Sequence, residues 1–381
     1  MIMSPFEGDN NVVNGMQYTN KHFLRTHSKG NDGADVQTQV WKAAFEPNFG
    51  TQDSYTNIVA TCGGNSICLI NVQTGTVVQK FNSNEGDIFN DVTWGRYNSK
   101  NILAAAGNTR FVYLICPTDS KVFNSTLKSF KARKVFITSL LFHPQEEGVL
   151  FCGRSTGEIV ITRILSEKNA GLEFIHCILH ARDCTILQMA FSQPCHTLLT
   201  ASEGGLKAWP LRADFLESKR IEEYAIEISP PPGFDSNCET NQIFDTVVVL
   251  GSQSSIVASK RALDGHIVVW DLADTLEDMN QKTEKLLACG DDKGCIWVYN
   301  LEAVLKNSNL GELSTQSTPL EPSCKIPWPK NLRDQWVAKK RKLDLDVYDI
   351  VIANVAMSEG FVVAVTNNNL VCIWERQQST Y

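Results

Sequence analysis

A short pattern recurs seven times along the chain: a tight polar turn is followed by an apolar segment that ends on an aromatic–acidic or similar pair. The clearest copy joins Asp264-Gly265-His266 to Ile267-Val268-Val269-Trp270-Asp271. Each copy is typical of a hairpin whose turn is made of small or left-handed-tolerant residues. The other turns open at Gly64-Asn65, Gly107-Asn108, Ser155-Thr156-Gly157, Gly204-Gly205, Asp292-Lys293-Gly294 and Asn367-Asn368-Asn369.

The spacing of these segments predicts a repeat architecture. The third strand of each unit is expected to begin near Ile67, Phe111, Ile159, Leu206, Ile267, Ile296 and Val371. Units of roughly 40–45 residues that end on a Trp-Asp style strand are the mark of a WD40-type β-propeller. We therefore predict an all-β fold, a WD40-type seven-bladed β-propeller over residues 21–377, preceded by a disordered tail over residues 1–20.

One unit is too short for this pattern. Only thirteen residues separate Leu272 from Leu286, whereas a fourth strand, its loop and the next first strand need roughly 15 or more. We expect one outer strand and one inner strand to be missing here, which leaves the sixth blade incomplete. The alternatives are a sequence that has lost a segment and an intact design of six and a half blades.

The two ends of the predicted propeller complement each other. The last unit ends after Val371-Cys372-Ile373-Trp374 and has no fourth strand. Near the N-terminus, His22 to His27 forms a predicted strand that belongs to no unit. Because open sheet edges are unfavourable, we expect this N-terminal strand to close the ring beside the C-terminal strand.

Composition narrows the functional classes. A net charge of −7 and a pI near 5.6 argue against nucleic-acid binding by the whole surface. No run of 18 apolar residues is present, so no membrane association is expected. The N-terminal twenty residues lack the apolar core of a signal peptide. Twelve scattered cysteines without a CxxC pair indicate free thiols in a reducing compartment.

The sequence offers no catalytic constellation. No HExxH, GxxxxGK or GxGxxG motif occurs. His176 and His180 are four residues apart, but the segment that carries them is typical of a strand, where they would be ordinary polar positions. We therefore expect a docking protein rather than an enzyme, without a cofactor and without a metal.

One basic run stands out in this acidic chain. Lys339-Lys340-Arg341-Lys342 places four cations side by side. Such a cluster is typical of a nuclear-localisation signal or of a phosphate contact. The alternative is a solvated loop between blades, balanced by Asp344 and Asp346.

Aromatic residues recur at the expected starts of inner strands, which ring the mouth of a propeller. They are Trp41, Phe89 beside Asn90, Phe136 and Tyr348. Two or three aromatic rings that face one another there form a cage for a methylated lysine, each ring contributing roughly 0.5–2 kcal/mol. The alternative, which the residues alone favour, is that these side chains are part of the core.

Several stretches resemble the family of leucine-rich-repeat and WD-repeat-containing proteins associated with the origin recognition complex (ORCA). The matching stretches are His22-Phe23-Leu24-Arg25-Thr26-His27-Ser28-Lys29, Gln39-Val40-Trp41-Lys42-Ala43-Ala44-Phe45-Glu46-Pro47, Val59-Ala60-Thr61-Cys62-Gly63-Gly64, Ile256-Val257-Ala258-Ser259-Lys260, Gly290-Asp291-Asp292-Lys293-Gly294 and Lys325-Ile326-Pro327-Trp328-Pro329. The resemblance implies a nuclear, non-enzymatic scaffold that binds origin recognition complex subunits and reads trimethylated histone H3 and H4 tails. It also implies a location on chromosomes in heterochromatin, centromeres or telomeres, with an indirect association with DNA.

The same stretches are more distantly similar to the Polycomb subunit called embryonic ectoderm development. This second resemblance implies an aromatic cage whose first position falls on Trp41 and whose second falls on Asn90, next to Phe89. A Polycomb-type methyl-lysine reader is therefore an alternative function. A cytoplasmic WD40 adaptor without ties to chromatin is another.

Overall fold

The computed structural model describes most of the chain, and every statement below concerns these residues. The described residues are 2–3, 18–32, 35–48, 54–84, 86–109, 111–126, 135–165, 171–179, 184–212, 214–217, 225–228, 243–251, 254–262, 267–272, 286–292, 294–301, 322–328 and 350–377.

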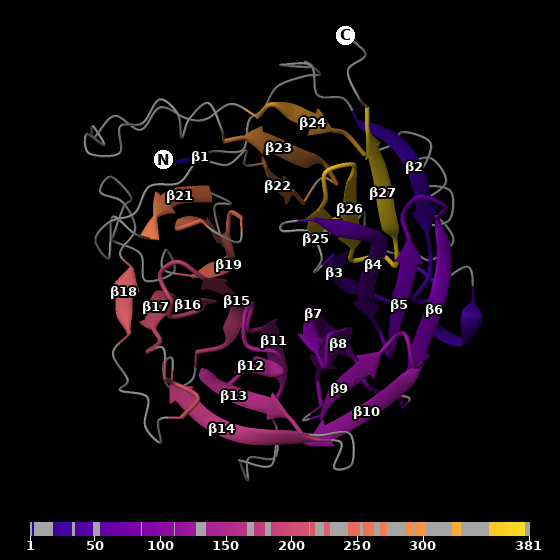
Figure 1. Ribbon diagram of the computed structural model, residues 1–381. Helices are drawn as coiled ribbons and strands as arrows, with labels where there is room; N and C mark the ends of the chain where they lie inside the picture. Colours follow the sequence, from indigo (N-terminus) through magenta and orange to yellow (C-terminus); the bar gives the residue numbers. More distant parts are fainter. Residues whose placement is uncertain are drawn as a thin grey trace.

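Seven antiparallel sheets are arranged as a ring around a central axis (Figure 1). In the first four, consecutive strands pair in chain order from the innermost to the outermost. Their strands are β3 (Val40–Pro47), β4 (Tyr55–Gly63), β5 (Ser66–Asn71) and β6 (Thr76–Asn82); β7 (Phe89–Tyr97), β8 (Lys100–Gly107), β9 (Phe111–Cys116) and β10 (Lys121–Thr126); β11 (Ile137–Phe142), β12 (Val149–Arg154), β13 (Glu158–Ile164) and β14 (Leu172–Leu179); β15 (Ile186–Ser192), β16 (Thr197–Ser202), β17 (Gly205–Pro210) and β18 (Ile226–Ile228).

The last three sheets depart from this order. The fifth and seventh each hold three consecutive strands and one strand from the N-terminal region, and the sixth holds three strands. Their strands are β19 (Phe244–Val249), β20 (Ile256–Arg261), β21 (Ile267–Asp271) and β1 (Ile2–Met3); β22 (Leu286–Gly290), β23 (Ile296–Asn300) and β24 (Cys324–Ile326); β25 (Ile352–Met357), β26 (Phe361–Thr366), β27 (Val371–Arg376) and β2 (Tyr18–Leu24). A short 3-10 turn, η1 (Lys29–Asn31), precedes β3. The seven-bladed propeller is confirmed, and all seven third strands lie where the repeat spacing predicted them.

The hydrophobic core lies between neighbouring sheets. Each of seven apolar clusters joins one sheet to the next. One of them packs Val40 and Phe45 of the first sheet against Val363 and Ile373 of the seventh. Burying side chains of this size contributes about 1.5–3 kcal/mol each. Because the last sheet packs on the first as the others pack on each other, the sheets form a closed ring.

The seventh sheet joins the two ends of the chain. β2 pairs antiparallel with β27, so that Leu24 lies opposite Val371 and Phe23 opposite Cys372. Residues 22–24 thus lie where the sequence placed the closing strand, whereas the predicted extension of that strand to His27 is wrong, because β2 ends at Leu24. The ring of Phe23 packs edge-on against the ring of the buried Trp374, with 5.7 Å between the ring centroids. Residues that follow β2 go on to contact the first sheet.

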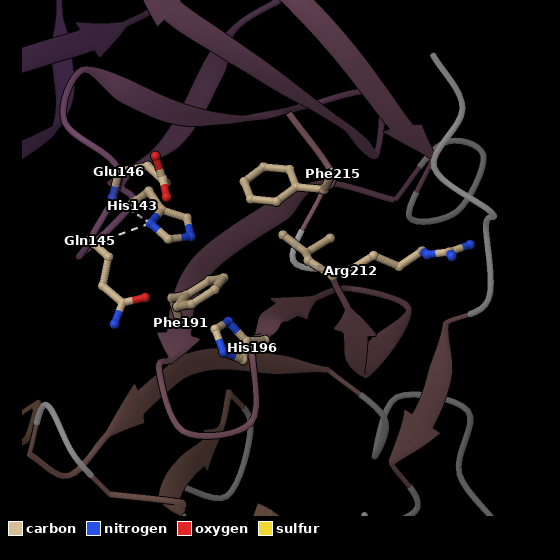
Figure 2. A pocket seen from close by; sticks show the side chains of 8 residues that line it. His143, Gln145, Glu146, Phe191, His196, Arg212 and Phe215 are labelled. Carbon is tan, nitrogen blue, oxygen red and sulfur yellow. Dashed lines mark hydrogen bonds between the residues drawn. The ribbon is translucent and has the colours of Figure 1, made fainter. Parts of the chain in front are cut away.

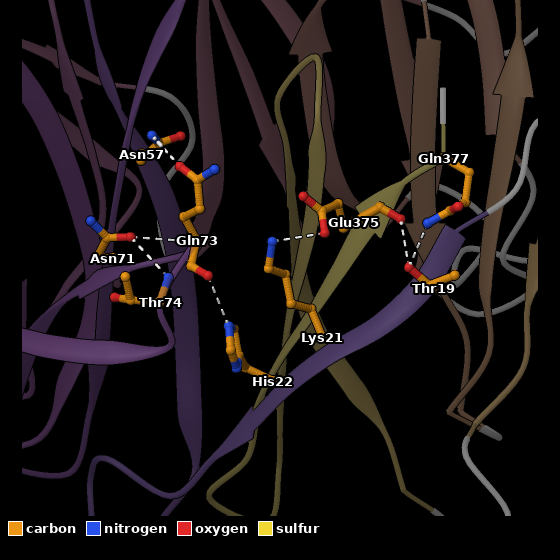
Figure 3. A network of polar contacts seen from close by, with 9 residues as sticks. All are labelled: Thr19, Lys21, His22, Asn57, Asn71, Gln73, Thr74, Glu375 and Gln377. Carbon is orange, nitrogen blue, oxygen red and sulfur yellow. Dashed lines mark hydrogen bonds and ion pairs between the residues drawn. The ribbon is translucent and has the colours of Figure 1, made fainter. Parts of the chain in front are cut away.

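Polar contacts hold the outer side of this junction (Figure 3). The Lys21 ammonium lies 2.7 Å from the Glu375 carboxylate, and the Gln377 amide donates a hydrogen bond to the Thr19 hydroxyl at 3.0 Å. The His22 ring bonds the Gln73 carbonyl of the first sheet at 3.2 Å. The N-terminal strand therefore contacts both the seventh sheet and the first sheet.

Two strands lie inside the range that the sequence assigned to a disordered tail. β1 pairs Ile2 with Val268 and Met3 with Ile267 at the outer edge of the fifth sheet, and β2 begins at Tyr18. In both cases no described strand of the sheet's own unit occupies its outermost edge, and N-terminal backbone groups pair with that edge. The propeller thus begins before residue 21, which corrects the predicted boundary.

The sixth sheet is the irregular one. Among the described residues no strand pairs with the inward edge of β22, so the innermost position is not occupied by a described strand. All five residues of β22 are half-buried, whereas the equivalent strands β12 and β16 are buried throughout. Residues 273–285, where the sequence placed the deficit, and residues 329–349 lie outside the described residues.

Candidate functional site

The innermost strands all begin on one face of the ring, which we call the strand-start face. Six of them share a bulge at their second residue, where the pairing register shifts by one. A bulge leaves one residue unpaired and re-aims its side chain. The bulged residues are Trp41, Asn90, Thr138, Leu187, Asp245 and Ala353.

The residue before β7, β11 and β25 is fixed by a side chain from the hairpin turn of its own sheet. The Ile88 N–H donates to the Asn108 side-chain oxygen at 2.7 Å, and the Val351 N–H donates to that of Asn367 at 3.2 Å. The Phe136 N–H donates to the Ser155 hydroxyl at 3.2 Å. These bonds set where the chain enters each sheet, so the side chains at the entry points have defined positions.

Four exposed apolar side chains gather on the strand-start face, one from each of four consecutive sheets. In ring order they are Val351, Trp41, Ile88 and Phe136, with exposed fractions of 39, 40, 44 and 42%. We call these four residues the apolar arc. Single exposed apolar residues are common on proteins, whereas a large contiguous apolar patch marks an interaction site.

The predicted cage residues divide between this face and the core. Trp41 and Asn90 occupy the same bulge position in the first two sheets. Phe89 is only 3% exposed, and its ring packs against Tyr113 at 5.2 Å. The strand-starting residues Val40 and Ile137 are buried in the same way, so Phe89 belongs to the core and does not line the mouth.

The other predicted site residues lie outside the described residues. They are Tyr348 and the basic cluster Lys339-Lys340-Arg341-Lys342. The strand assignment of His176 is confirmed, because it lies within β14; His180 lies outside the described residues.

A buried carboxylate beneath Asn90 ties three innermost strands together. Asp91 accepts the Leu140 N–H at 2.7 Å, and its carboxylate lies 3.9 Å from the Lys42 ammonium. Burial raises the pKa of Asp91, while Lys42 and the backbone N–H groups act in the opposite direction. No sequence pattern indicates this link, because Asp91 and Leu140 lie 49 residues apart on two neighbouring sheets.

Within the described part of the chain, the chemistry-bearing side chains form no metal site. No three His, Cys, Asp or Glu residues there are placed to hold an ion. The ten described cysteines are free, and burial raises the pKa of Cys152 to about 12, which keeps that thiol protonated. No helix among these residues has the length and apolar character needed to cross a bilayer.

The ring of seven antiparallel sheets defines a WD40-type β-propeller. The family described as "Leucine-rich repeat and WD repeat-containing protein 1, WD domain" matches residues 12–284. The match covers more than half of the chain, which therefore belongs to this family.

Relatives of that name occur in several vertebrates. The protein from Xenopus laevis is 29% identical over 398 aligned residues, which cover 93% of this chain and 52% of the relative. The protein from Homo sapiens is 26% identical over 413 residues, which cover 98% of this chain and 60% of the relative. The chain thus spans little more than half the length of the relatives it matches.

Solved structures support the fold alone, because their sequence identities are low. A chain of the humanized Chaetomium thermophilum Polycomb Repressive Complex 2 bound to the inhibitor GSK126 aligns with a TM-score of 0.61 at 15% identity, covering 94% of this chain and 98% of that chain. The WD40 repeats of RRP9 align with a TM-score of 0.62 at 12% identity, covering 95% of this chain and all of that one.

Proposed function

We propose that this propeller is a chromatin-associated scaffold that binds the origin recognition complex and engages histone tails carrying repressive trimethyl-lysine marks. Membership of the family supports the scaffold role. The apolar arc is the observation that carries the histone part, because it offers a surface for an extended tail at the mouth of the ring. We place this activity in the nucleus, on heterochromatin, with any association with DNA being indirect.

Trp41 is the side chain we assign to the methylated lysine. Its bulge position and exposure present an indole to a ligand on the strand-start face. A trimethylammonium group over a Trp face gains about 0.5–2 kcal/mol. Asn90, at the same position of the next sheet, contributes an amide rather than a second ring. Tyr348 and the basic cluster Lys339-Lys340-Arg341-Lys342 stay predictions for the cage and for nuclear import.

Peptide binding tests the histone part. Fluorescence polarisation should show tighter binding of a trimethylated histone H3 peptide than of the unmodified peptide. Trp41→Ala should weaken binding of the trimethylated peptide by roughly 2- to 30-fold, which corresponds to the cation–π energy. Tyr55→Ala is the matched control, because Tyr55 is an exposed aromatic of the same sheet at the start of β4. Equal affinities for the two peptides, or no effect of Trp41→Ala, would refute the reader role.

Partner capture tests the scaffold part. A pull-down from nuclear extract should recover origin recognition complex subunits. Recovery of a methyltransferase complex instead would favour a Polycomb-type reader. Alanine substitution of Lys339 to Lys342 should reduce nuclear entry, and unchanged entry would favour an adaptor without ties to chromatin.

A further inference from the structure

A second site lies at the opposite end of the ring, where the innermost strands end. A cavity of about 170 Å³ opens there between the third and fourth sheets (Figure 2). Its walls come from the turn after β11, the turn between β15 and β16, and the segment after β17. Phe136 of the apolar arc and His143 of the cavity flank the two ends of β11, which places them about 20 Å apart. The cavity is therefore separate from the apolar arc.

The imidazole of His143 is locked in one tautomer. Its Nδ1 accepts the backbone N–H groups of Gln145 at 3.2 Å and Glu146 at 3.0 Å. A ring nitrogen that accepts hydrogen bonds carries no proton, so the neutral ring carries its proton on Nε2. Figure 2 shows this second nitrogen facing the space bounded by Phe191, His196 and Phe215.

His143 is buried but its donor is not used within the protein. The residue is 8% exposed. Its ring packs against the rings of Phe191 and Phe215, with centroid distances of 4.5 Å and 5.6 Å. Among the described residues no acceptor bonds the Nε2–H. The Nε2–H faces the cavity, where an acceptor that enters from outside can bond it.

The charges around the cavity favour a negative acceptor. Arg212 and His196 lie at its rim, and the ion pair of Arg212 with Asp214, at 3.6 Å, is exposed to solvent. The acidic lining residue Glu146 lies on the other side of the imidazole from Nε2 (Figure 2). Burial lowers the pKa of His143 to about 4, and His196 acts in the same direction. The ring is thus a neutral donor at pH 7, and an anion bound beside it would raise its pKa.

We propose that this cavity binds the carboxylate of an acidic side chain presented by a partner protein, with the His143 Nε2–H donating at its base and Arg212 and His196 at its rim. This site is independent of the histone-tail surface. Two binding sites at opposite ends of one ring allow the propeller to hold two partners at once.

The test uses the full chain with isotopically labelled histidine and a capped Gly-Glu-Gly tripeptide as the probe. Nuclear magnetic resonance should show a saturable shift of the His143 ring signal on addition of the probe. The pKa of His143 should rise by at least about one unit, which means that the probe binds the charged ring tenfold more tightly than the neutral ring. The matched Gly-Gln-Gly tripeptide should leave that pKa unchanged. Glu146→Gln should make binding of the Gly-Glu-Gly probe several-fold tighter, because it removes the negative charge of an acidic residue that lines the cavity.

His143→Leu replaces the imidazole by an apolar side chain of similar size and removes the hydrogen-bond donor. If its thermal unfolding matches the parent, the His196 signal should no longer respond to Gly-Glu-Gly. If the His143→Leu variant does not fold, the Glu146→Gln variant tests the proposal by itself. Equal responses to the two tripeptides, no response to either, or no tightening by Glu146→Gln would overturn the proposal.

Discussion

Two regions of the ring depend on the N-terminal part of the chain, and they differ in how firmly it holds them. In the seventh sheet, β2 pairs along the full length of β27 and buries Phe23 against Trp374. In the fifth sheet, β1 pairs with β21 through two residues. The neighbouring sixth sheet holds three described strands.

The contrast extends to the polar contacts. After β2, His27 is buried and bonds the Ser66 hydroxyl at 2.8 Å and the Thr61 hydroxyl at 2.9 Å in the first sheet. The Asn369 side chain accepts the His27 N–H at 3.2 Å and donates to Ser28 at 2.9 Å. The difference teaches that a strand of full length with buried polar contacts at its end holds a sheet edge firmly. A strand of two residues holds its edge weakly.

Truncation gives the largest expected effect. Removing residues 1–25 deletes β2 and exposes the edge of β27, so cooperative thermal unfolding followed by circular dichroism should be lost. Removing residues 1–10 deletes only β1 and should lower the unfolding temperature by no more than a few degrees. Equal effects of the two truncations would show that the two regions are equally important.

Acid should weaken the seventh-sheet junction through His27. Burial lowers the pKa of His27 to about 3, with Lys80 acting in the same direction. The unfolded chain takes up a proton on this ring below pH 6.5, whereas the native chain does so only near pH 3. Stability is therefore lost as the pH falls between these values, by up to about 5 kcal/mol.

Chemical denaturation across this pH range measures the loss. His27→Gln removes the titrating group, so the variant should lose less stability on acidification than the parent. Identical pH dependence in both proteins would show that His27 is not held in its neutral form.

A pair of equivalent leucines gives the smallest effect and compares the third and sixth sheets. Leu150 in β12 is fully buried, whereas Leu287 in β22 is half-buried. Leu150→Ala should cost about 2–5 kcal/mol of unfolding free energy, and Leu287→Ala roughly half of that or less. Urea denaturation measures both, and equal losses would mean that the sixth sheet is packed as tightly as the third.

Much of the fold follows from the sequence because it depends on local patterns. The turn-plus-strand repeat placed β5, β9 and β21 correctly, and the thirteen residues after Leu272 marked the irregular region. The pairing of β1 with β21 could not be predicted, because two residues carry no recognisable strand pattern and their partner lies more than 260 positions away.

The candidate sites were harder to predict for the same reason. Sequence placed Trp41 at the mouth but did not distinguish it from Phe89, because the bulge that reverses which side chain faces the core is a property of the pairing. The His143 cavity went unnoticed, since three separate turns contribute to it. A histidine two residues before a Gln-Glu pair gives no signal without the aromatic rings that bury it.

A disulfide cross-link tests the closed ring most directly. Thr19 and Glu375 lie opposite each other in the β2–β27 pair, where Cα atoms are about 4.5–5.5 Å apart, within the range that a disulfide bridges. The double variant Thr19→Cys, Glu375→Cys should form this bond within one molecule under mild oxidation, as peptide mass mapping would show, while each single variant should not. A double variant that stays reduced, or that links two molecules instead, would contradict the closure of the propeller by its own N-terminal strand.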